Sequence, residues 1–252
     1  MTEPLFSIIT INFNNKEGLK KTIDSVFAQS FQDYEYIIID GGSTDGSKEL
    51  IELYAMKDDF KKHVTYWCSE PDDGIYNAMN KGISHAKGNF INMMNSGDCL
   101  KENTLSSLSN IATQHKNEIL YGAVNFIEKG HFILTYGKSA ENIKDGMIPH
   151  QSCFVPHSIY ERYGSYDESL KIASDYDKFL CFYMNGEKFF YTSLIIADYD
   201  REGISSTQEE LHIKEKIAVQ KRYGVYIVPT RKQLLKQAMK KMIKKILEML
   251  HL

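Results

Sequence analysis

The fold of this chain is decided by two nearby stretches, Glu70-Pro71-Asp72-Asp73-Gly74-Ile75-Tyr76-Asn77-Ala78-Met79-Asn80-Lys81-Gly82 and Asn95-Ser96-Gly97-Asp98. The first is an acidic loop that opens a short amphipathic helix, which we expect over 75–86 with Gly88 as its C-cap. An apolar strand over 89–94 follows and ends in the second stretch, a polar turn with one carboxylate. Open α/β sheets bind nucleotides at the carboxyl ends of their strands. The two stretches therefore predict oxygen ligands at the nucleotide-binding edge of a sheet.

The residues upstream repeat the same alternation of strand and helix. Apolar, β-rich runs predict strands over 6–12, 36–39 and 64–68, and apolar residues at helical spacing predict helices over 16–29 and about 46–57. This order is typical of a parallel sheet with right-handed crossovers. We expect an α/β fold with a mostly parallel central sheet flanked by helices.

The pattern changes after Asp98. The elements expected there are a helix over 103–113, a hairpin of 119–127 and 131–136, a helix over 175–184, a strand over 189–196 and a helix over 208–223. Since no internal repeat or Pro/Gly-rich linker interrupts the sequence, one continuous domain is favoured over two. We assign residues 1–230 to it, with a nucleotide-binding half (1–100) and an acceptor and base half (101–230), followed by a tail (231–252).

Charge is unevenly distributed along the chain. The net charge of −3 combines +6 on residues 231–252, from seven Lys or Arg and one Glu, with −9 on the preceding residues. Because the body is acidic and has no basic stripe, we expect no nucleic-acid partner.

The tail has the pattern of a basic amphipathic helix. Its apolar residues follow one another in steps of four and three, with lysines on the opposite side: Leu235, Met239, Met242, Ile246 and Met249. This pattern suits an anionic membrane surface. Packing on the body or a seam between two copies in a homodimer are the alternatives, because the same spacing suits helix pairing.

The remaining composition points to the cytoplasm. The four cysteines, Cys68, Cys99, Cys153 and Cys181, form no Cys-x-x-Cys pair, which argues against a metal cluster or a disulfide framework. No secretory leader and no apolar run of about 18 residues is present. We expect a cytoplasmic protein, peripheral on the inner face of the cell membrane through its tail.

Five spaced elements carry a resemblance to a known family. They are Thr10-Ile11-Asn12-Phe13-Asn14, Asp40 before Gly41-Gly42-Ser43, the stretch 70–82, the turn 95–98, and Ala173-Ser174-Asp175-Tyr176-Asp177. Over residues 6–206 the chain resembles the family 2 glycosyltransferases of the GT-A fold, in particular small bacterial enzymes that build cell-surface polysaccharides. The resemblance implies a Rossmann-like nucleotide-binding half and inverting transfer of a sugar. The donor would be a nucleotide diphosphate sugar, with a UDP-sugar favoured. The metal would be Mn²⁺ or Mg²⁺, and the acceptor would be a hydroxyl of a glycan or lipid-linked molecule.

The resemblance also assigns residues to the nucleotide. Thr10, Asn12 and Asn14 would contact the base, Asp40 would accept a hydrogen bond from the uracil ring, and Asp72 and Ser96 would lie along the nucleotide. A plain strand end is the alternative for the first three. For Asp40 it is a turn-former or helix cap.

Asp98 takes the place of the family's metal-binding acid. Mg²⁺ and Mn²⁺ favour oxygen ligands and often combine one or two carboxylates with substrate phosphates and water. Because Asn95 and Gly97 stand where other members carry acids, we expect metal and nucleotide to bind together and metal alone to bind weakly. A capping aspartate in a β-turn is the alternative.

Asp175 resembles the family's catalytic base. It lies at a predicted helix start, where the helix dipole favours the ionised carboxylate. An N-cap is the alternative for Asp175, and Asp177 is a rival for the role. His150-Gln151 matches a pair common in these relatives and is expected near the donor sugar or the acceptor, although a lone histidine is often structural. The segment 203–206 resembles a loop that closes over the diphosphate.

Three other classes were weighed. A sugar nucleotidyltransferase should carry an Arg- and Pro-bearing glycine-rich loop after the first strand, and Asn14-Asn15-Lys16-Glu17-Gly18 has no such character. A dinucleotide dehydrogenase is disfavoured because no Gly-x-Gly-x-x-Gly occurs. A non-catalytic nucleotide-sugar-binding module is the main alternative, and it would keep Asp40 and Asp98 but show no turnover.

Overall fold

The computed structural model describes residues 3–202, 208–226 and 228. Two predicted features, the closing loop over 203–206 and the tail over 231–252, lie outside the described residues.

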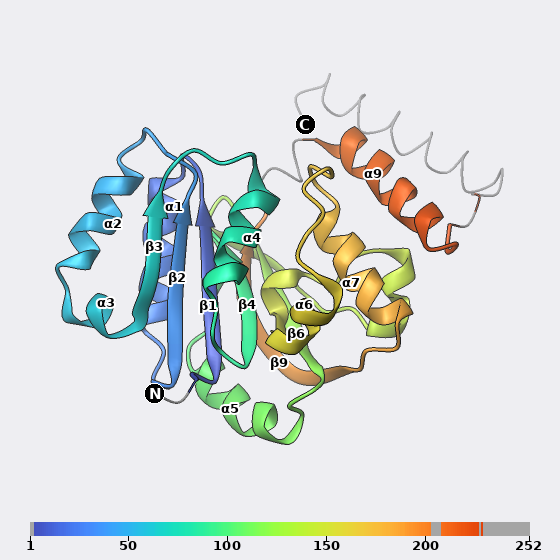
Figure 1. Ribbon diagram of the computed structural model, residues 1–252, viewed down its shortest axis with the longest axis horizontal. Helices are drawn as coiled ribbons and strands as arrows, with labels where there is room; N and C mark the ends of the chain where they lie inside the picture. Colours follow the sequence, from blue (N-terminus) through green and yellow to red (C-terminus); the bar gives the residue numbers. More distant parts are fainter. Residues whose placement is uncertain (1–2, 203–207, 227, 229–252) are drawn as a thin grey trace.

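The first half is built on four parallel strands in the order β3-β2-β1-β4 (Figure 1). These strands are β1 (Phe6–Asn12), β2 (Tyr34–Asp40), β3 (Val64–Ser69) and β4 (Phe90–Asn95). The register places Asn12 opposite Asp40, and Asp40 opposite Ser69. The predicted parallel arrangement is confirmed, and the carboxyl ends of the strands meet at one edge.

The helices of this half differ from the prediction in two places. They are α1 (Lys16–Phe27), α2 (Ser47–Ala55), the short α3 (Asp58–His63) and α4 (Ile75–His85). Helix α2 matches the helix expected over about 46–57, and α3 is an additional short helix that was not predicted. The expected C-cap role of Gly88 is wrong, because α4 ends at His85. A Cβ on Gly88 would lie 2.6 Å from the backbone nitrogen of Ser7, so glycine is needed there for the close approach to β1.

The second half extends the same sheet in the order β8-β6-β9-β5, with β7 paired to β6. Its elements are β5 (Cys99–Leu100), α5 (Thr104–Gln114), β6 (Ile119–Glu128), β7 (His131–Tyr136), the 3₁₀ helices η1 (Ala140–Asp145) and η2 (His150–Ser152), β8 (Cys153–Pro156), α6 (His157–Tyr163), α7 (Ser174–Met184), β9 (Phe189–Asp200) and α9 (Glu209–Arg222). The predicted hairpin is confirmed, and its tight turn has positive φ at Lys129 and Gly130. Strand β9 runs past the predicted end at Ile196 to Asp200.

Helices lie on both faces of the sheet (Figure 1), and buried apolar side chains form one layer on each face. Side chains of α4, α6 and α7 pack on one face, and those of α1, α2 and α5 pack on the other. In β1, Ile9 and Ile11 point to the first layer, whereas Phe6 and Ile8 point to the second. This alternation on two buried faces explains why the strand is a continuous apolar run.

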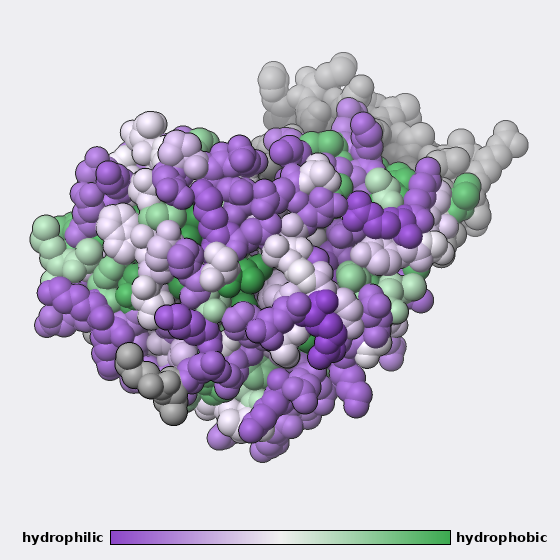
Figure 2. Space-filling view, viewed as in Figure 1, coloured by the Kyte–Doolittle hydropathy of each residue, from purple (hydrophilic) through white to green (hydrophobic). Residues whose placement is uncertain are grey.

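The molecular face seen in Figure 2 is mostly hydrophilic, and hydrophobic residues reach it only in small separate patches. Among the described residues, no helix has the length and apolar composition needed to cross a bilayer.

Candidate functional site

A cavity of about 1050 Å³ lies at the carboxyl ends of β1 and β4 and is lined by both halves of the chain. The polar residues in its wall that matter for the argument are Asn12, Asp72, Asp98, His150, Asp175 and Asp200. Among the predicted site residues, the structure thus brings Asp98 and Asp175 to one cavity, although they come from different halves.

One end of the cavity combines an aromatic ring with a carboxylate. Phe13 follows β1 and is 64% exposed, which is unusual for a phenylalanine. Asp72 comes from the acidic loop, and its Oδ1 accepts a hydrogen bond from the backbone N–H of Gly74 at 2.9 Å. Both contact Gly41, where a Cβ would lie 2.5 Å from Asp72 Oδ2 and 3.3 Å from Phe13 Cδ2. A ring face beside hydrogen-bond acceptors suits a nucleoside. Phe13 belongs to a segment predicted to contact the base, but no role was predicted for Phe13 itself.

Asp40 lies behind this end of the cavity rather than in its wall. Its carboxylate is fully buried and accepts hydrogen bonds from Asn12 Nδ2 and from the Ser43 and Ser69 hydroxyls, each at 2.6 Å. The direct contact with a base that was expected of Asp40 therefore has no support in the geometry.

Asn12 lies between Asp40 and the cavity and lines the cavity wall. Because a carboxylate only accepts, the Asn12 amide must turn its NH₂ toward Asp40. Asn12 Oδ1 is then left buried, with no hydrogen-bond partner among the described residues. Asn12 itself is one of the residues that line the cavity at this strand end.

Of the other residues predicted to contact the nucleotide, Ser96 lines the cavity and Thr10 and Asn14 do not. Thr10 is buried two residues before the strand end, and its hydroxyl accepts from Tyr36 at 2.9 Å. Asn14 ties two loops together, since its side chain accepts from the backbone N–H of Thr44 at 2.8 Å. Neither residue lines the cavity, so the geometry does not support direct contacts from them. Ser96 does line it.

Asp98 is a buried carboxylate, only 3% exposed, in the cavity wall. Its Oδ1 accepts from the backbone N–H of Asp200 and its Oδ2 from Gln151 Nε2, both at 2.9 Å. Burial raises the pKa of Asp98 to about 6, against the opposing effect of these two hydrogen bonds.

Asp200 is a second carboxylate here, and sequence reasoning missed it. Its Oδ2 lies 3.2 Å from the position of a Cβ on Gly97, and its charge helps to raise the pKa of Asp98. Asn95 Oδ1 also belongs to a wall residue and has no partner among the described residues. Extending the strand predicted over 189–196 would have placed Asp200 at its carboxyl end.

The chemical type of these oxygens suits a divalent cation. Two carboxylates and one amide oxygen are the ligands that Mg²⁺ and Mn²⁺ prefer. The described residues contain no cluster of three His, Cys, Asp or Glu side chains with metal-binding spacing. A cation at Asp98 would therefore complete its shell with substrate phosphates and water.

Asp175 lies in the first turn of α7 and is held from two sides. Its Oδ1 accepts from the Tyr76 hydroxyl at 3.2 Å, and its Oδ2 lies 3.2 Å from His150 Nδ1. Burial, and then the charge of Asp175, raise the pKa of Tyr76 well above its usual value, so its hydroxyl remains a donor. The carboxylate is fixed in orientation and faces the cavity.

The adjacent residues His150 and Gln151 hold two different carboxylates. His150 contacts Asp175, whereas Gln151 donates to Asp98. The short helix η2 therefore sets the spacing between the two acids. His150 Nε2 is buried and has no partner among the described residues.

Asp177 is turned away from the cavity. It is 5% exposed and pairs with Arg222 Nη1 at 2.7 Å. Burial raises the pKa of Asp177, and Arg222 opposes this rise. The geometry therefore supports Asp175 and not Asp177 as the acid that faces a substrate.

Comparison with known proteins gives a consistent result. The family model described as "Glycosyl transferase family 2" matches residues 7–161. The uncharacterized glycosyltransferase Rv1514c of Mycobacterium tuberculosis is 30% identical over 213 residues, which are 82% of this chain and 79% of the relative. The PGL/p-HBAD biosynthesis glycosyltransferase Rv2957 of the same species is 27% identical over 237 residues, 90% of each chain.

Solved structures share the fold. Staphylococcus aureus TarS 1–349 in complex with UDP-GlcNAc has a TM-score of 0.71 and 16% identity, over 89% of this chain and 68% of that one. The mannosyltransferase PcManGT from Pyrobaculum calidifontis, in complex with GDP-Man and Mn²⁺, has a TM-score of 0.65 and 16% identity, over 88% and 65%.

Proposed function

Since the chain belongs to glycosyl transferase family 2 and has the GT-A fold, we propose that it is an inverting enzyme that moves a sugar from a UDP-sugar to an acceptor hydroxyl. The acceptor would be a glycan or lipid-linked intermediate of surface polysaccharide synthesis. Family membership makes the chain a glycosyltransferase. The donor, the stereochemistry, the metal and the acceptor are parts of the proposal.

One observation carries this proposal. Asp98 and Asp175 come from separate halves of the chain, line the same cavity and are joined through His150 and Gln151. Inverting transfer needs one carboxylate to take a proton from the acceptor and a separate group of ligands to stabilise the leaving diphosphate.

We propose that the nucleoside end of the cavity binds uracil. The ring of the base would lie against Phe13 with its N–H directed at Asn12, and Asp72 would lie beside the ribose. Because Asp40 acts behind Asn12, it is a positioning residue in this arrangement. The complex of TarS with UDP-GlcNAc supports the choice of a UDP-sugar.

Asp98, Asp200 and Asn95 would hold Mn²⁺ or Mg²⁺ together with the diphosphate of the donor. When bound, the cation offsets the charge that grows on the departing diphosphate. The Mn²⁺ in the PcManGT complex supports this part of the proposal.

Asp175 acts as the general base. It takes the proton from the acceptor hydroxyl while that oxygen attacks the anomeric carbon, and the bond from this carbon to the diphosphate oxygen breaks on the opposite face. Tyr76 and His150 keep the carboxylate pointed at the acceptor oxygen.

We place the acceptor beside the aromatic rings of the cavity. Phe126 and Tyr136 stack with their centroids 5.1 Å apart, and both line the cavity together with Tyr199. Ring faces of this kind pack against the apolar face of a sugar ring. Attachment to the membrane through 231–252 is part of the proposal and rests on the sequence pattern.

A thermal-shift panel of UDP-, GDP- and dTDP-sugars, each with and without Mn²⁺, tests the proposal. We expect the largest rise in Tm with a UDP-sugar and Mn²⁺ together, about 2.7 kcal/mol of stabilisation at a hundredfold excess over Kd. Mn²⁺ alone should have little effect. A panel in which no nucleotide sugar raises Tm, or in which Mn²⁺ alone raises it as much, would contradict the proposal. A non-catalytic binding module would show the shift but release no UDP.

A further inference from the structure

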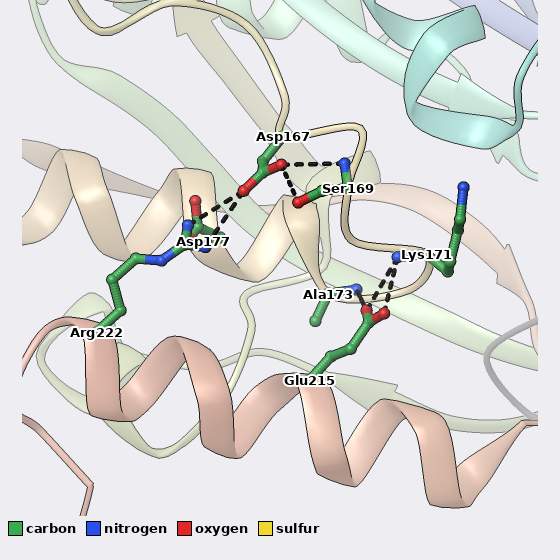
Figure 3. A network of polar contacts seen from close by, with 7 residues as sticks. All are labelled: Asp167, Ser169, Lys171, Ala173, Asp177, Glu215 and Arg222. Atoms are coloured by element: carbon green, nitrogen blue, oxygen red, sulfur yellow. Dashed lines mark hydrogen bonds and ion pairs between the residues drawn. The ribbon is translucent and has the colours of Figure 1, made fainter.

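Helix α9 makes two contacts with α7, the helix that carries Asp175, and with the segment just before it (Figure 3). Figure 1 shows α9 at the outer side of α7, on the far side from β1. The family model ends at residue 161, so neither α9 nor α7 belongs to the matched region. The contacts suggest that α9 has a role in the site itself.

Glu215 makes the first contact. Its carboxylate accepts the backbone N–H groups of Lys171, Ile172 and Ala173 at 2.9–3.1 Å, and the residue is 9% exposed. Ala173 is the N-cap residue of α7 and has no side chain that can cap the helix. A carboxylate from another helix therefore holds the three peptide groups that directly precede Ser174 and Asp175.

Arg222 makes the second contact, two turns further along α9. Its guanidinium lies 2.7 Å from Asp177 Oδ1 and 3.3 Å from Asp167 Oδ2. Asp167 in turn accepts from the backbone N–H and hydroxyl of Ser169. The loop before α7 and the first turn of α7 are thus tied to the same arginine, as Figure 3 shows.

The two contacts lie on one face of α9 that also reaches the core and the cavity. Val219 is 1% exposed and packs in the apolar layer with α7. His212 is one of the residues that line the cavity. Residues 212, 215, 219 and 222 follow the helical spacing of one stripe. This stripe explains why α9 stays against α7 although most of its other residues are exposed.

We propose that α9 is a clamp that sets the position of the catalytic base, with Glu215 as its main positioning residue. This proposal rests on the role proposed for Asp175. Without Glu215, three N–H groups lose their acceptor, two of them buried, and the turn 171–173 rearranges. A shift of about 1 Å at Asp175 is enough to lower the rate up to about 100-fold.

The first test needs no activity. Hydrogen exchange of the amides at 171–176 is measured by mass spectrometry in the full chain for the wild type, Glu215→Ala and Glu210→Ala. Glu210 is exposed on the same helix, so its substitution removes the same charge without the contacts. We expect exchange at least about tenfold faster in Glu215→Ala only. Glu215→Gln keeps an acceptor oxygen and should give an intermediate rate. Equal exchange in the Glu215→Ala and Glu210→Ala variants would overturn the clamp.

The second test asks whether Glu215 acts through Asp175. The kcat for UDP release from a UDP-sugar is compared for Glu215→Ala, Asp175→Asn and the double variant. We expect Glu215→Ala to lower kcat about 10- to 100-fold with the Kd for UDP changed less than twofold, and to have no further effect in the Asp175→Asn background. Multiplied effects in the double variant, or a parallel loss of UDP binding, would overturn the proposal. If the proposed function itself fails, Asp175→Asn leaves kcat unchanged, while the exchange experiment still reports on the clamp.

Discussion

Replacing Asp98 by asparagine is predicted to stabilise the metal-free protein at neutral pH. Burial raises the pKa of Asp98 from the usual 3.8 to about 6, and the nearby Asp200 charge adds to this rise. Since one pH unit corresponds to 1.36 kcal/mol, holding this carboxylate ionised above pH 6 costs about 3 kcal/mol relative to the unfolded chain. Between about pH 4 and pH 6 the native state binds more protons than the unfolded state, so stability falls as pH rises through this window.

The Asp98→Asn variant removes this cost without losing the local hydrogen bonds. Its carbonyl can still accept from the backbone N–H of Asp200, and Gln151 can turn its amide to accept from the new NH₂ group. We expect an increase in Tm on the order of 6–12 °C at pH 7.5 in EDTA, from about 3 kcal/mol at about 2–4 °C per kcal/mol for a chain of this size. The increase should shrink toward zero as the pH is lowered to about 4.

The assay is thermal unfolding followed by circular dichroism over pH 4–8, with Asp72→Asn as the control. Asp72 is a partly exposed acid of the same cavity, and its substitution should give no such pH-dependent gain. The stabilised Asp98→Asn protein should lose the extra rise in Tm that a UDP-sugar gives with Mn²⁺. A variant less stable than the wild type at pH 7.5, or a difference that does not change with pH, would refute the reasoning.

Three further predictions concern other parts of the site and the tail. Gly41→Ala places a Cβ 2.5 Å from Asp72 Oδ2 and displaces that carboxylate. Calorimetry should show UDP binding about tenfold weaker, a loss of about 1.4 kcal/mol. An unchanged Kd for UDP would contradict a contact between Asp72 and the nucleotide. His150→Asn keeps a hydrogen-bond donor toward Asp175, so its kcat should fall on the order of tenfold, against 100-fold for His150→Ala. Both variants should retain the affinity for UDP. Equal rates in the two variants would argue against an orienting role of His150. Deletion of 231–252 should abolish co-sedimentation with anionic vesicles and leave UDP binding intact, whereas unchanged sedimentation would end the membrane prediction.

The strands of the first half and the place of Asp98 at one edge of the sheet were predictable from the sequence pattern. Strands buried on both faces read as continuous apolar runs, and parallel strands must end at one edge. Asp98 lies in the turn that follows the end of β4 at Asn95, so its place depends mainly on that strand. Asp175 could be assigned only through the family resemblance, because the long chain between the halves fixes no distance between them.

Side-chain direction was not predictable. Asp40 follows the same pattern as Asp98, yet it points inward because the register with β3 puts the Ser69 hydroxyl beside it. Thr10 lies in the right segment but meets Tyr36 across the sheet. In both residues a contact made far along the chain decides which way the side chain points.

Long-range partners were missed for the same reason. Asp200 reaches Asp98 only because β9 runs on past the predicted end at Ile196. Glu215 caps a turn more than forty residues earlier in the chain, as its contact with Ala173 shows. An exposed helix with acidic residues gives no local indication that one of them has such a partner.

The central claim is that Asp175 is the base of a sugar transfer that takes place in the shared cavity. It is tested most directly by the rate of UDP release from a UDP-sugar with Mn²⁺, compared for the wild type and Asp175→Asn. If Asp175 is the base, the kcat of this variant is lower by at least about 100-fold and its Kd for UDP is retained. A near-wild-type rate in this variant would contradict it.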